Sequence, residues 1–147
     1  MQYNYIEVPA SVLLKQEQLL QEYSKESKSS LVPTINPNYT MYTKLENLGM
    51  LNCIAAVSNN SIIGFIVLLT TVMPHYSQLS TTVESFFVHK DHRKFGTGKR
   101  LINMAETIAK SKGSSVMFMS APEGSRLEKA TKLFGFKQTH KLYIKSL

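Results

Sequence analysis

The sequence predicts an α/β layer fold with a mixed β-sheet, and three patterns in the chain indicate it. Two apolar segments of strand length, residues 51–58 and 62–71, flank a polar turn. Residues 81–112 and residues 115–134 each join a strand pattern to a helical pattern. A hairpin followed by two strand–helix units is typical of a sheet covered by helices. With 43% hydrophobic residues, the chain has enough apolar material for a core, and we expect residues 1–147 to form a single domain.

The N-terminal part of the chain predicts a strand and then a helix. Residues 3–8 alternate well enough for a strand, and Pro9 ends it because proline cannot donate to a sheet ladder. Ser11 is a suitable N-cap for a helix whose apolar positions continue to about Ser24. Residues 24–30 are polar and are expected to form a turn.

The middle of the chain predicts a connection, a short helix and a hairpin. Residues 31–39 contain two prolines, so we expect an irregular, mobile connection there. Residues 39–48 predict a short second helix that ends at Gly49. The sequence Asn59-Asn60-Ser61 is typical of a hairpin turn, and residues 73–77 are expected to form a loop.

The last third of the chain predicts a strand, a helix and a final strand. Residues 115–119 are an apolar run, as expected for a central strand that is covered on both faces. Residues 126–134 predict the last helix. Gly135-Phe136 then turns the chain into residues 138–145, which we expect to form the final strand.

A basic turn that contains glycine separates the strand at residues 81–88 from the helix at residues 98–112. It carries Gly96 and Gly98 among four lysine and arginine side chains. Glycines let backbone N–H groups approach a ligand closely, and the first turn of a helix offers unpaired N–H donors and the positive end of its dipole. The turn therefore predicts a phosphate site, and pyrophosphate in particular. A solvated basic turn that only caps the helix is the alternative.

Spacing excludes two common nucleotide-binding motifs. The P-loop needs a glycine five residues before its Gly-Lys pair and Ser or Thr after the lysine. Arg93 and Arg100 occupy those positions here. The dinucleotide fingerprint needs a third glycine where this chain has Leu101, and an acidic residue about twenty residues later. Residues 114–122 contain no acid.

The pattern that remains is Arg-x-x-Gly-x-Gly at residues 93–98, after a strand that ends at Val88 and with Gly135-Phe136 near the C-terminus. It resembles the pyrophosphate-binding motif of the Gcn5-related N-acetyltransferase (GNAT) superfamily, whose members hold acetyl-coenzyme A (acetyl-CoA). The resemblance implies a three-layer fold: a twisted, mixed and mostly antiparallel sheet flanked by helices. It also implies an acyltransferase that moves acetyl from acetyl-CoA to a primary amine by direct attack in a ternary complex.

The same resemblance implies which residues bind the cosubstrate. In this family the strand before the motif is splayed from its neighbour and the pantetheine arm lies in the gap, so the backbone of Phe86 and Val88 would contact pantetheine and thioester. The backbone N–H groups that would hold the pyrophosphate belong to Arg93, Lys94, Phe95, Gly96, Thr97, Gly98 and Lys99. Residues 120–129, together with Gly135-Phe136, also look like small acetyltransferase-like proteins carried by bacteriophages.

Glu84 is the candidate general base, because it is the only acid on this strand. In the resembled family a carboxylate near this place is a frequent base, sometimes acting through water. A structural or solvent-facing Glu84 is the alternative, and His75 on the preceding loop is a second candidate base. The region before residue 50 lies over the acceptor site in the family. Its candidates to line an acceptor pocket, with packing against the sheet as the alternative, are Tyr39, Met41 and Tyr42.

The general acid is where the chain departs from the family. Many members carry a tyrosine four residues before the Gly-Phe pair, and this chain has Thr131. The asparagine that often follows the preceding strand is also missing. A threonine hydroxyl is a poor proton donor to a thiolate, so solvent, Ser125 or Tyr143 would have to protonate it, or catalysis is slow or absent. This departure keeps open a rival function: a coenzyme A-binding module without catalysis.

The charge of the chain limits the kinds of partner it could bind, and its cysteine content indicates a cellular compartment. Of the net charge of +7, residues 126–147 carry six basic side chains and one acidic side chain. That excess predicts either a solvated surface or a contact with an acidic protein or nucleic acid. Cys53 is the only cysteine, which fits a reducing cytoplasm, and its apolar surroundings favour core packing over an acyl-carrying role. No spacing suggests a metal, no apolar run suggests a membrane span, and a two-fold homodimer is the default expectation.

Overall fold

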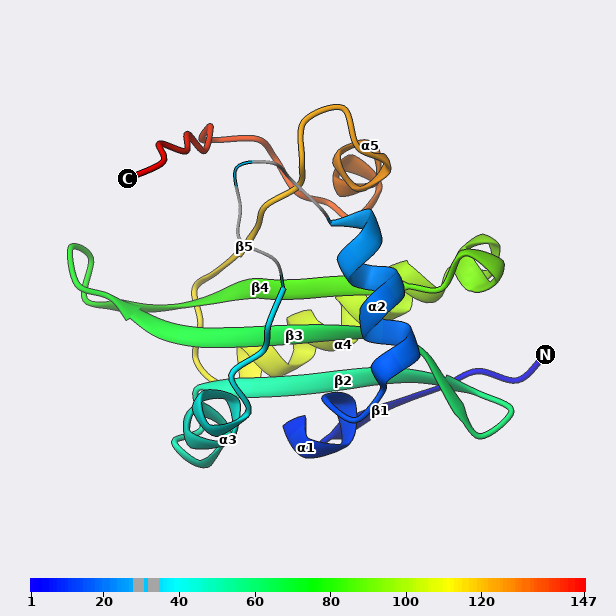
Figure 1. The fold of residues 1–147 in the computed structure, drawn as a ribbon. Coiled ribbons are helices and arrows are strands. Elements are labelled where there is room, and N and C mark those ends of the chain that lie inside the picture. The colour runs from blue at the N-terminus through cyan, green and yellow to red at the C-terminus, as the bar shows by residue number, and fades with distance from the viewer. Residues whose placement is uncertain (28–30, 32–34) are drawn as a thin grey trace.

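The computed structural model describes residues 1–27, 31 and 35–147. Its centre is a twisted five-stranded sheet in the order β1-β2-β3-β4-β5 (Figure 1). Neighbours from β1 to β4 pair antiparallel, and β5 pairs parallel with β4. The prediction of a mixed, mostly antiparallel sheet is confirmed. The strands are β1 Asn4–Val8, β2 Leu51–Ser58, β3 Ser61–Met73, β4 Gln78–Val88 and β5 Val116–Met119.

Helices cover both faces of the sheet, so the predicted three layers are confirmed (Figure 1). On one face lie α1 (Ala10–Leu13), α2 (Glu17–Glu26) and α3 (Tyr39–Asn47), and on the other lies α4 (Thr97–Ser111). A short 3₁₀ helix, η1 (Lys90–Phe95), joins β4 to α4, and α5 (Arg126–Leu133) follows β5.

Each face of the sheet has its own apolar cluster. Phe65, Val67 and Phe87 pack toward α1 and α2 with Leu13 and Leu19. Ile54, Ile66, Leu68 and Val83 pack toward α4 with Leu101 and Ile102. Successive residues of a strand point to opposite faces, which explains why neighbours such as Ile66 and Val67 belong to different clusters.

The hairpin and α3 form as predicted. Asn59 and Asn60 both have positive φ (49° and 59°), as the favoured two-residue hairpin turn requires. The predicted helix over residues 39–48 is α3, and the Asn38 side chain caps it by accepting a hydrogen bond from Met41 N at 2.9 Å. The predicted turn over residues 24–30 was wrong for residues 24–26, which continue α2, and residues 28–30 lie outside the described residues. Residues 32–34 of the predicted 31–39 connection also lie outside them.

The single helix expected from Ser11 to about Ser24 is two helices, so that prediction was wrong. Leu13 and Leu19 are both buried in the same cluster. Six residues apart, they would point about 120° away from each other on one continuous helix. The chain resolves this by leaving helical geometry at Gln16 (ψ 66°) and starting again in α2. Ser11 is not the cap; Ala10 N donates instead to Glu46 Oε2 of α3 at 2.7 Å.

The C-terminal part departs most from expectation. The run at residues 115–119 gives a four-residue strand at the sheet edge rather than a central strand, and Val116 and Phe118 are 43% and 42% exposed. Residues 138–145 form no strand beside β5 in the structure. Residues 137–141 are five consecutive polar side chains, which supply little apolar area to hold a strand in place.

Candidate functional site

The two parallel strands β4 and β5 separate halfway along β4. They pair only from Ser80 to Val83 on β4, opposite Val116–Met119. On its other side β4 stays paired with β3 as far as Val88. From Glu84 to Val88, therefore, one edge of β4 has no neighbouring strand among the described residues. Phe86 and Val88 direct their main-chain groups to the same edge because strand residues alternate, although Val88 O already accepts from Arg93 Nε at 2.7 Å.

Glu84 lies at a β-bulge. On β3, Val67 pairs with Ser85 and the next residue, Leu68, pairs with Val83, so Glu84 is an extra residue without a partner. A bulge changes the direction of the side chains around it. As a result Glu84 and Ser85, although adjacent in sequence, both line the same pocket.

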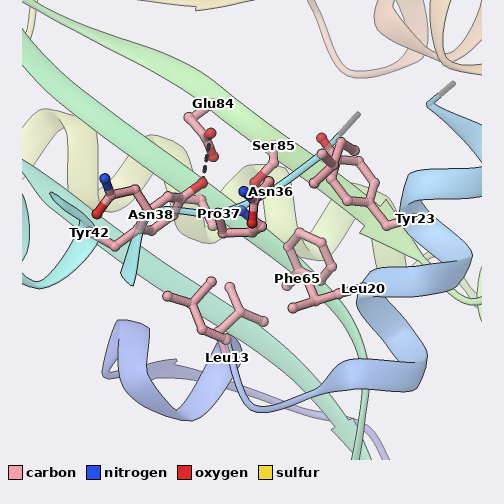
Figure 2. A pocket seen from close by; sticks show the side chains of 13 residues that line it. Leu13, Leu20, Tyr23, Asn36, Pro37, Asn38, Tyr42, Phe65, Glu84 and Ser85 are labelled. Atoms are coloured by element: carbon pink, nitrogen blue, oxygen red, sulfur yellow. Dashed lines mark hydrogen bonds between the residues drawn. The ribbon is translucent and has the colours of Figure 1, made fainter. Parts of the chain in front are cut away.

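This pocket has a volume of about 290 Å³ and lies between the sheet, α1, α2 and the chain leading into α3 (Figure 2). Glu84 and the Tyr42 hydroxyl lie on one side of it, and Leu13, Leu20 and Phe65 lie on the opposite side (Figure 2). The Tyr42 hydroxyl donates to Glu84 Oε1 at 2.8 Å. The polar side chains of the lining are Tyr23, Asn36, Asn38, Tyr42, Glu84 and Ser85.

Two phenols line the pocket in their neutral form, and Tyr42 is the one that contacts the Glu84 carboxylate. Burial raises the pKa of Tyr42 far above its ordinary value, and the charge of Glu84 and the hydrogen bond to it raise that pKa further. Burial, and secondly the Glu84 charge, also raises the pKa of Tyr23. Both side chains are therefore hydrogen-bond donors at neutral pH. Glu84 is the one carboxylate in the lining, which contains no Lys, Arg or His among the described residues.

The predicted phosphate turn offers free backbone donors at the start of α4. Arg100 N is the first N–H of this helix to reach a carbonyl, donating to Gly96 O at 3.1 Å. The N–H groups of Thr97, Gly98 and Lys99 precede it and have no intrahelical acceptor. The cap residue, Gly96, has no side chain to accept from them. Arg93, Lys94 and Phe95 lie in η1, where i→i+3 bonds engage backbone N–H groups.

The two glycines of the turn serve different purposes. Gly96 is left-handed (φ 73°), and a Cβ placed there meets no atom within 4 Å, so the space beside this residue is open. A Cβ on Gly98 would lie 3.2 Å from Cζ of Phe86 and 3.5 Å from Cζ of Phe134. Gly98 therefore lets β4 and the C-terminal segment pack closely against the start of α4.

The basic side chains around the turn differ in whether they are available to a ligand. Lys94 and Lys99 are exposed, and neither forms an ion pair with a described residue. Arg100 lies over the Tyr5 ring at 5.8 Å. Arg93 points away from the turn: Nη2 donates to both Glu26 carboxylate oxygens, and its guanidinium lies 5.5 Å from the centre of the Phe87 ring.

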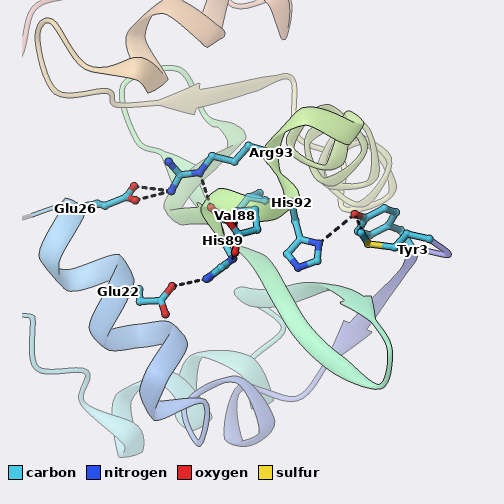
Figure 3. A network of polar contacts seen from close by, with 9 residues as sticks. Tyr3, Glu22, Glu26, Val88, His89, His92 and Arg93 are labelled. Carbon is cyan, nitrogen blue, oxygen red and sulfur yellow. Dashed lines mark hydrogen bonds and ion pairs between the residues drawn. The ribbon is translucent and has the colours of Figure 1, made fainter.

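A polar network ties α2 to this turn (Figure 3). Arg93 bonds to Glu26, and His89 Nε2 lies 3.2 Å from Glu22 Oε2. His92 Nδ1 is 3.1 Å from the Tyr3 hydroxyl. Because Tyr23 lies between the two glutamates on α2, the network connects the wall of the pocket to the predicted pyrophosphate turn. The two histidines thus contact protein groups in the structure.

Some predicted acceptor-site residues lie in the pocket and others do not. Tyr42 lines it, as proposed. Tyr39 and Met41 are about half exposed and do not line it. His75 is absent from the lining and packs edge-on against the neighbouring Tyr76 ring. Tyr23 and Ser85 were missed, because nothing local in the sequence indicates that α2 or the bulge brings them to Glu84.

The proposed substitutes for the missing general acid are not in the pocket. Ser125 caps α5, its Oγ accepting from Glu128 N at 3.1 Å, and the Thr131 hydroxyl donates to Glu128 O at 2.6 Å. Tyr143 is 84% exposed. Cys53 is fully buried in β2, and burial raises the pKa of its thiol to about 12, so it is a poor nucleophile.

Two other kinds of site are absent from residues 1–27, 31 and 35–147. No group of three or more His, Cys, Asp or Glu side chains there is arranged to hold a metal ion. None of the helices in that part of the chain has the length and apolarity needed to cross a membrane.

We compared the sequence with models of known protein families and with curated proteins. The model of the acetyltransferase (GNAT) family matches residues 16–136. A search of curated proteins with the sequence found no match.

Solved structures similar to this chain include several acetyltransferases. Ribosomal-protein-alanine N-acetyltransferase from Brucella melitensis biovar Abortus 2308 superimposes with a TM-score of 0.75, 18% identity and 100% coverage of both chains. Aminoglycoside acetyltransferase meta-AAC0020 from an uncultured soil metagenomic sample, in complex with sisomicin, has a TM-score of 0.77 and 16% identity, over 99% of this chain and 96% of that one. AAC(6')-Iy, in complex with the bisubstrate analog CoA-S-monomethyl-acetylneamine, has a TM-score of 0.77 and 17% identity, over 100% and 99%. At these identities the similarity shows a shared fold.

Proposed function

Because the chain belongs to the acetyltransferase (GNAT) family, we propose that it transfers an acetyl group from acetyl-CoA to a primary amine by direct attack in a ternary complex. The observation that carries this proposal is the position of Glu84, a carboxylate at a bulge where β4 separates from β5 and a pocket opens. Acetyl-CoA would supply the activated acyl group as a thioester.

The residues of the turn fit the pyrophosphate of this cosubstrate. Thr97, Gly98 and Lys99 offer N–H groups without helical acceptors, and the space beside Gly96 is open. Lys94 and Lys99 add positive charge that no carboxylate of the described chain neutralises. The backbone of Phe86 and Val88 would lie along the pantetheine arm, at the free edge of β4. These assignments narrow the predicted donors from residues 93–99 to the N–H groups of Thr97, Gly98 and Lys99, because Arg93, Lys94 and Phe95 lie in η1, and Arg93 would act by positioning the turn.

Glu84 would accept the proton of the attacking amine, directly or through water. Its carboxylate is exposed to the pocket and is oriented by the Tyr42 hydroxyl. Tyr42 and Tyr23 are the two phenols of the described pocket lining, and they would be the candidate proton donors in place of the tyrosine that the family usually carries where this chain has Thr131. A raised pKa makes each a weak acid, so solvent remains the alternative proton source for the departing thiolate.

The family leaves the acceptor open. Two of the similar structures are named for ribosomal-protein alanine and for aminoglycosides, and identities of 16–18% do not carry either acceptor over. We place the reaction in the cytoplasm, where a buried, unpaired Cys53 thiol stays reduced. The homodimer and the likeness to bacteriophage proteins stay predictions.

The rival proposal is a coenzyme A-binding module that engages an acidic protein or nucleic acid through its basic C-terminal segment. The exposure of residues 137–147 favours it, because this segment carries lysines that no described carboxylate neutralises. Retention on a nucleic-acid column that falls steeply with salt would support this module.

The first experiment is thermal melting with and without acetyl-CoA, followed by thiol release in a panel of primary amines. Acetyl-CoA at a hundred times its dissociation constant should stabilise the fold by about 2.7 kcal/mol. Glu84→Gln should keep this stabilisation and lose thiol release, whereas Glu123→Gln, an exposed carboxylate outside the pocket, should keep both. Stabilisation without thiol release from any amine would favour the binding module, and no stabilisation would contradict both proposals.

A further inference from the structure

We propose that the acceptor is a small primary monoamine, in which the ammonium group pairs with Glu84 and one apolar or aromatic group lies against Leu20 and Tyr23, over the buried side chains of Leu13 and Phe65. This inference rests on the proposed function, since the amine that binds here is the one to be acetylated.

The charge of the pocket limits the acceptor to one cationic group. Among the described residues Glu84 is the one carboxylate in the lining, and the other nearby acids, Glu46 and Glu7, lie outside it and hydrogen-bond to other parts of the protein. Glu46 accepts from Ala10 N at 2.7 Å, and Glu7 accepts from Asn52 Nδ2 at 2.6 Å. A second ammonium group inside the pocket would lose its hydration without gaining a carboxylate, which is costly. A polyamine or a polycationic sugar therefore fits poorly.

The same inventory disfavours an anionic acceptor. The pocket lining has no lysine, arginine or histidine among the described residues. A carboxylate or phosphate on the acceptor would meet Glu84 as a like charge, and the nearby Tyr23 and Tyr42 hydroxyls provide hydrogen bonds but no positive charge.

The wall opposite Glu84 is suited to an apolar group (Figure 2). Seven of the thirteen lining residues are aliphatic, proline or phenylalanine. Leu13 and Phe65 form the floor of this wall and are each only 1% exposed, so the partly exposed Leu20 is the apolar side chain that a ligand would contact. The Tyr23 ring meets the Phe65 ring edge to face at 5.4 Å between centres, so Phe65 is covered and the partly exposed Tyr23 ring is the aromatic surface that a ligand could contact.

The size of the pocket favours a small molecule. Its volume of about 290 Å³ equals that of on the order of ten water molecules and is at the lower end of ligand pockets, which span about 300–1,000 Å³. A single aromatic or branched aliphatic amine fits this space, whereas a molecule of several linked rings exceeds it.

Calorimetric binding to the full chain saturated with coenzyme A tests the inference without requiring turnover. The probes are 2-phenylethylamine, spermidine as a polycation and 3-phenylpropanoate as an anion with a similar ring. We expect 2-phenylethylamine to bind at least tenfold more tightly than spermidine, and 3-phenylpropanoate to show no binding. Glu84→Gln should weaken 2-phenylethylamine at least tenfold, because it removes a charge-assisted hydrogen bond. Glu123→Gln is the matched control and should change nothing.

A second variant tests the apolar wall separately. Leu20→Ala should weaken 2-phenylethylamine several-fold and leave methylamine unchanged, because methylamine carries no group long enough to reach Leu20. Both variants must first show the wild-type circular dichroism spectrum and melting with coenzyme A.

Three results would overturn the inference: tighter binding of spermidine, no binding of 2-phenylethylamine, or tenfold tighter binding of the tripeptide Phe-Gly-Gly, which would indicate a polypeptide acceptor. These results are distinct from failure of the proposed function. If 2-phenylethylamine binds as expected but no amine is acetylated, the pocket assignment stands and the enzymatic proposal fails. If other amines are acetylated while 2-phenylethylamine does not bind, the enzymatic proposal stands and the pocket assignment fails.

Discussion

Arg93 donates through Nη2 to both carboxylate oxygens of Glu26, at 2.6 and 2.7 Å, and so joins two segments that are 67 residues apart in sequence. It also donates through Nε to Val88 O. The first residue of the Arg-x-x-Gly-x-Gly pattern thus fixes α2, which carries Tyr23, to the end of β4. In this chain the motif arginine positions the pocket wall relative to the turn that we propose for the pyrophosphate.

Arg93→Ala should therefore destabilise the protein more than loss of its exposed ion pair alone would. The variant loses the bond to Val88 O and the contact with the Phe87 ring as well as the Glu26 pair. We expect the free energy of unfolding in urea to fall by about 1–2 kcal/mol. Glu26→Gln should cost less than about 1 kcal/mol, because Glu26 is half exposed. Lys25→Ala, an exposed neighbour on α2, is the control; an equal loss for all three would contradict this role.

Gly96→Ala should lower the stability of the fold and, as a separate effect, weaken acetyl-CoA binding. A non-glycine residue with left-handed φ costs about 1 kcal/mol, and the new Cβ would lie at the N-cap of α4, beside the amides that we propose for the pyrophosphate. We expect the dissociation constant of acetyl-CoA, measured by calorimetry, to rise at least tenfold.

Gly124 provides a closely matched control for that change. It has the same φ, 73°, and a Cβ there also meets nothing within 4 Å, but it lies in the turn before α5. Gly124→Ala should lower stability by a similar amount and leave acetyl-CoA affinity within twofold. Equal affinities for the two variants would show that the pyrophosphate binds elsewhere.

Tyr42→Phe should lower the rate of acetyl transfer with little effect on folding. The change removes the hydroxyl that donates to Glu84 and keeps the ring that packs against the pocket. We expect kcat/KM for the acceptor to fall about tenfold, the cost of roughly 1.4 kcal/mol in the transition state. The KM for acetyl-CoA should be unchanged. Tyr39→Phe, on the same helix but outside the pocket, should retain full activity; a similar loss there would point to a general effect on α3.

Cys53 should make stability fall at alkaline pH. Burial raises the pKa of its thiol from an ordinary value of 9.0 to about 12 in the folded protein, so the unfolded state loses its proton first. Between about pH 9 and pH 12 the unfolded state binds fewer protons, and the free energy of unfolding decreases as pH rises. Cys53→Ala should have a lower free energy of unfolding than wild type at pH 7, because the substitution leaves a cavity. Between about pH 8 and pH 10.5, however, its free energy of unfolding should decrease less than that of wild type, because the titrating thiol is gone. Parallel pH profiles in urea would contradict this.

The hairpin, the strand before the motif and α4 could be predicted because their signals are local. Asn59-Asn60 favours a turn by its own backbone preferences, and the apolar positions of α4 repeat on one helical face. The glycines of the turn were also recognised correctly as special, although only Gly96 needs a left-handed conformation and Gly98 is required by the Phe86 ring.

The environment of β5, the break between α1 and α2 and the pocket lining could not be predicted, because they depend on contacts between segments that are distant in sequence. The apolar run of β5 suggested burial on both faces, but burial depends on whether another strand lies beside it, and residues 138–145 do not. The break between α1 and α2 follows from the shared burial of Leu13 and Leu19. Glu84 was identified from its place on the strand, whereas its partner Tyr42 was chosen together with two neighbours that lie outside the pocket.

Residue 84 makes no pair with β3 and is not needed to keep the register of the sheet. Val83 and Ser85 already sit opposite two consecutive residues of β3 and already face opposite sides. A chain lacking that single amino acid could close a regular ladder without shifting anything on either flank. If Glu84 is the base that we propose, deletion of this one residue would remove the catalytic carboxylate and leave the sheet intact.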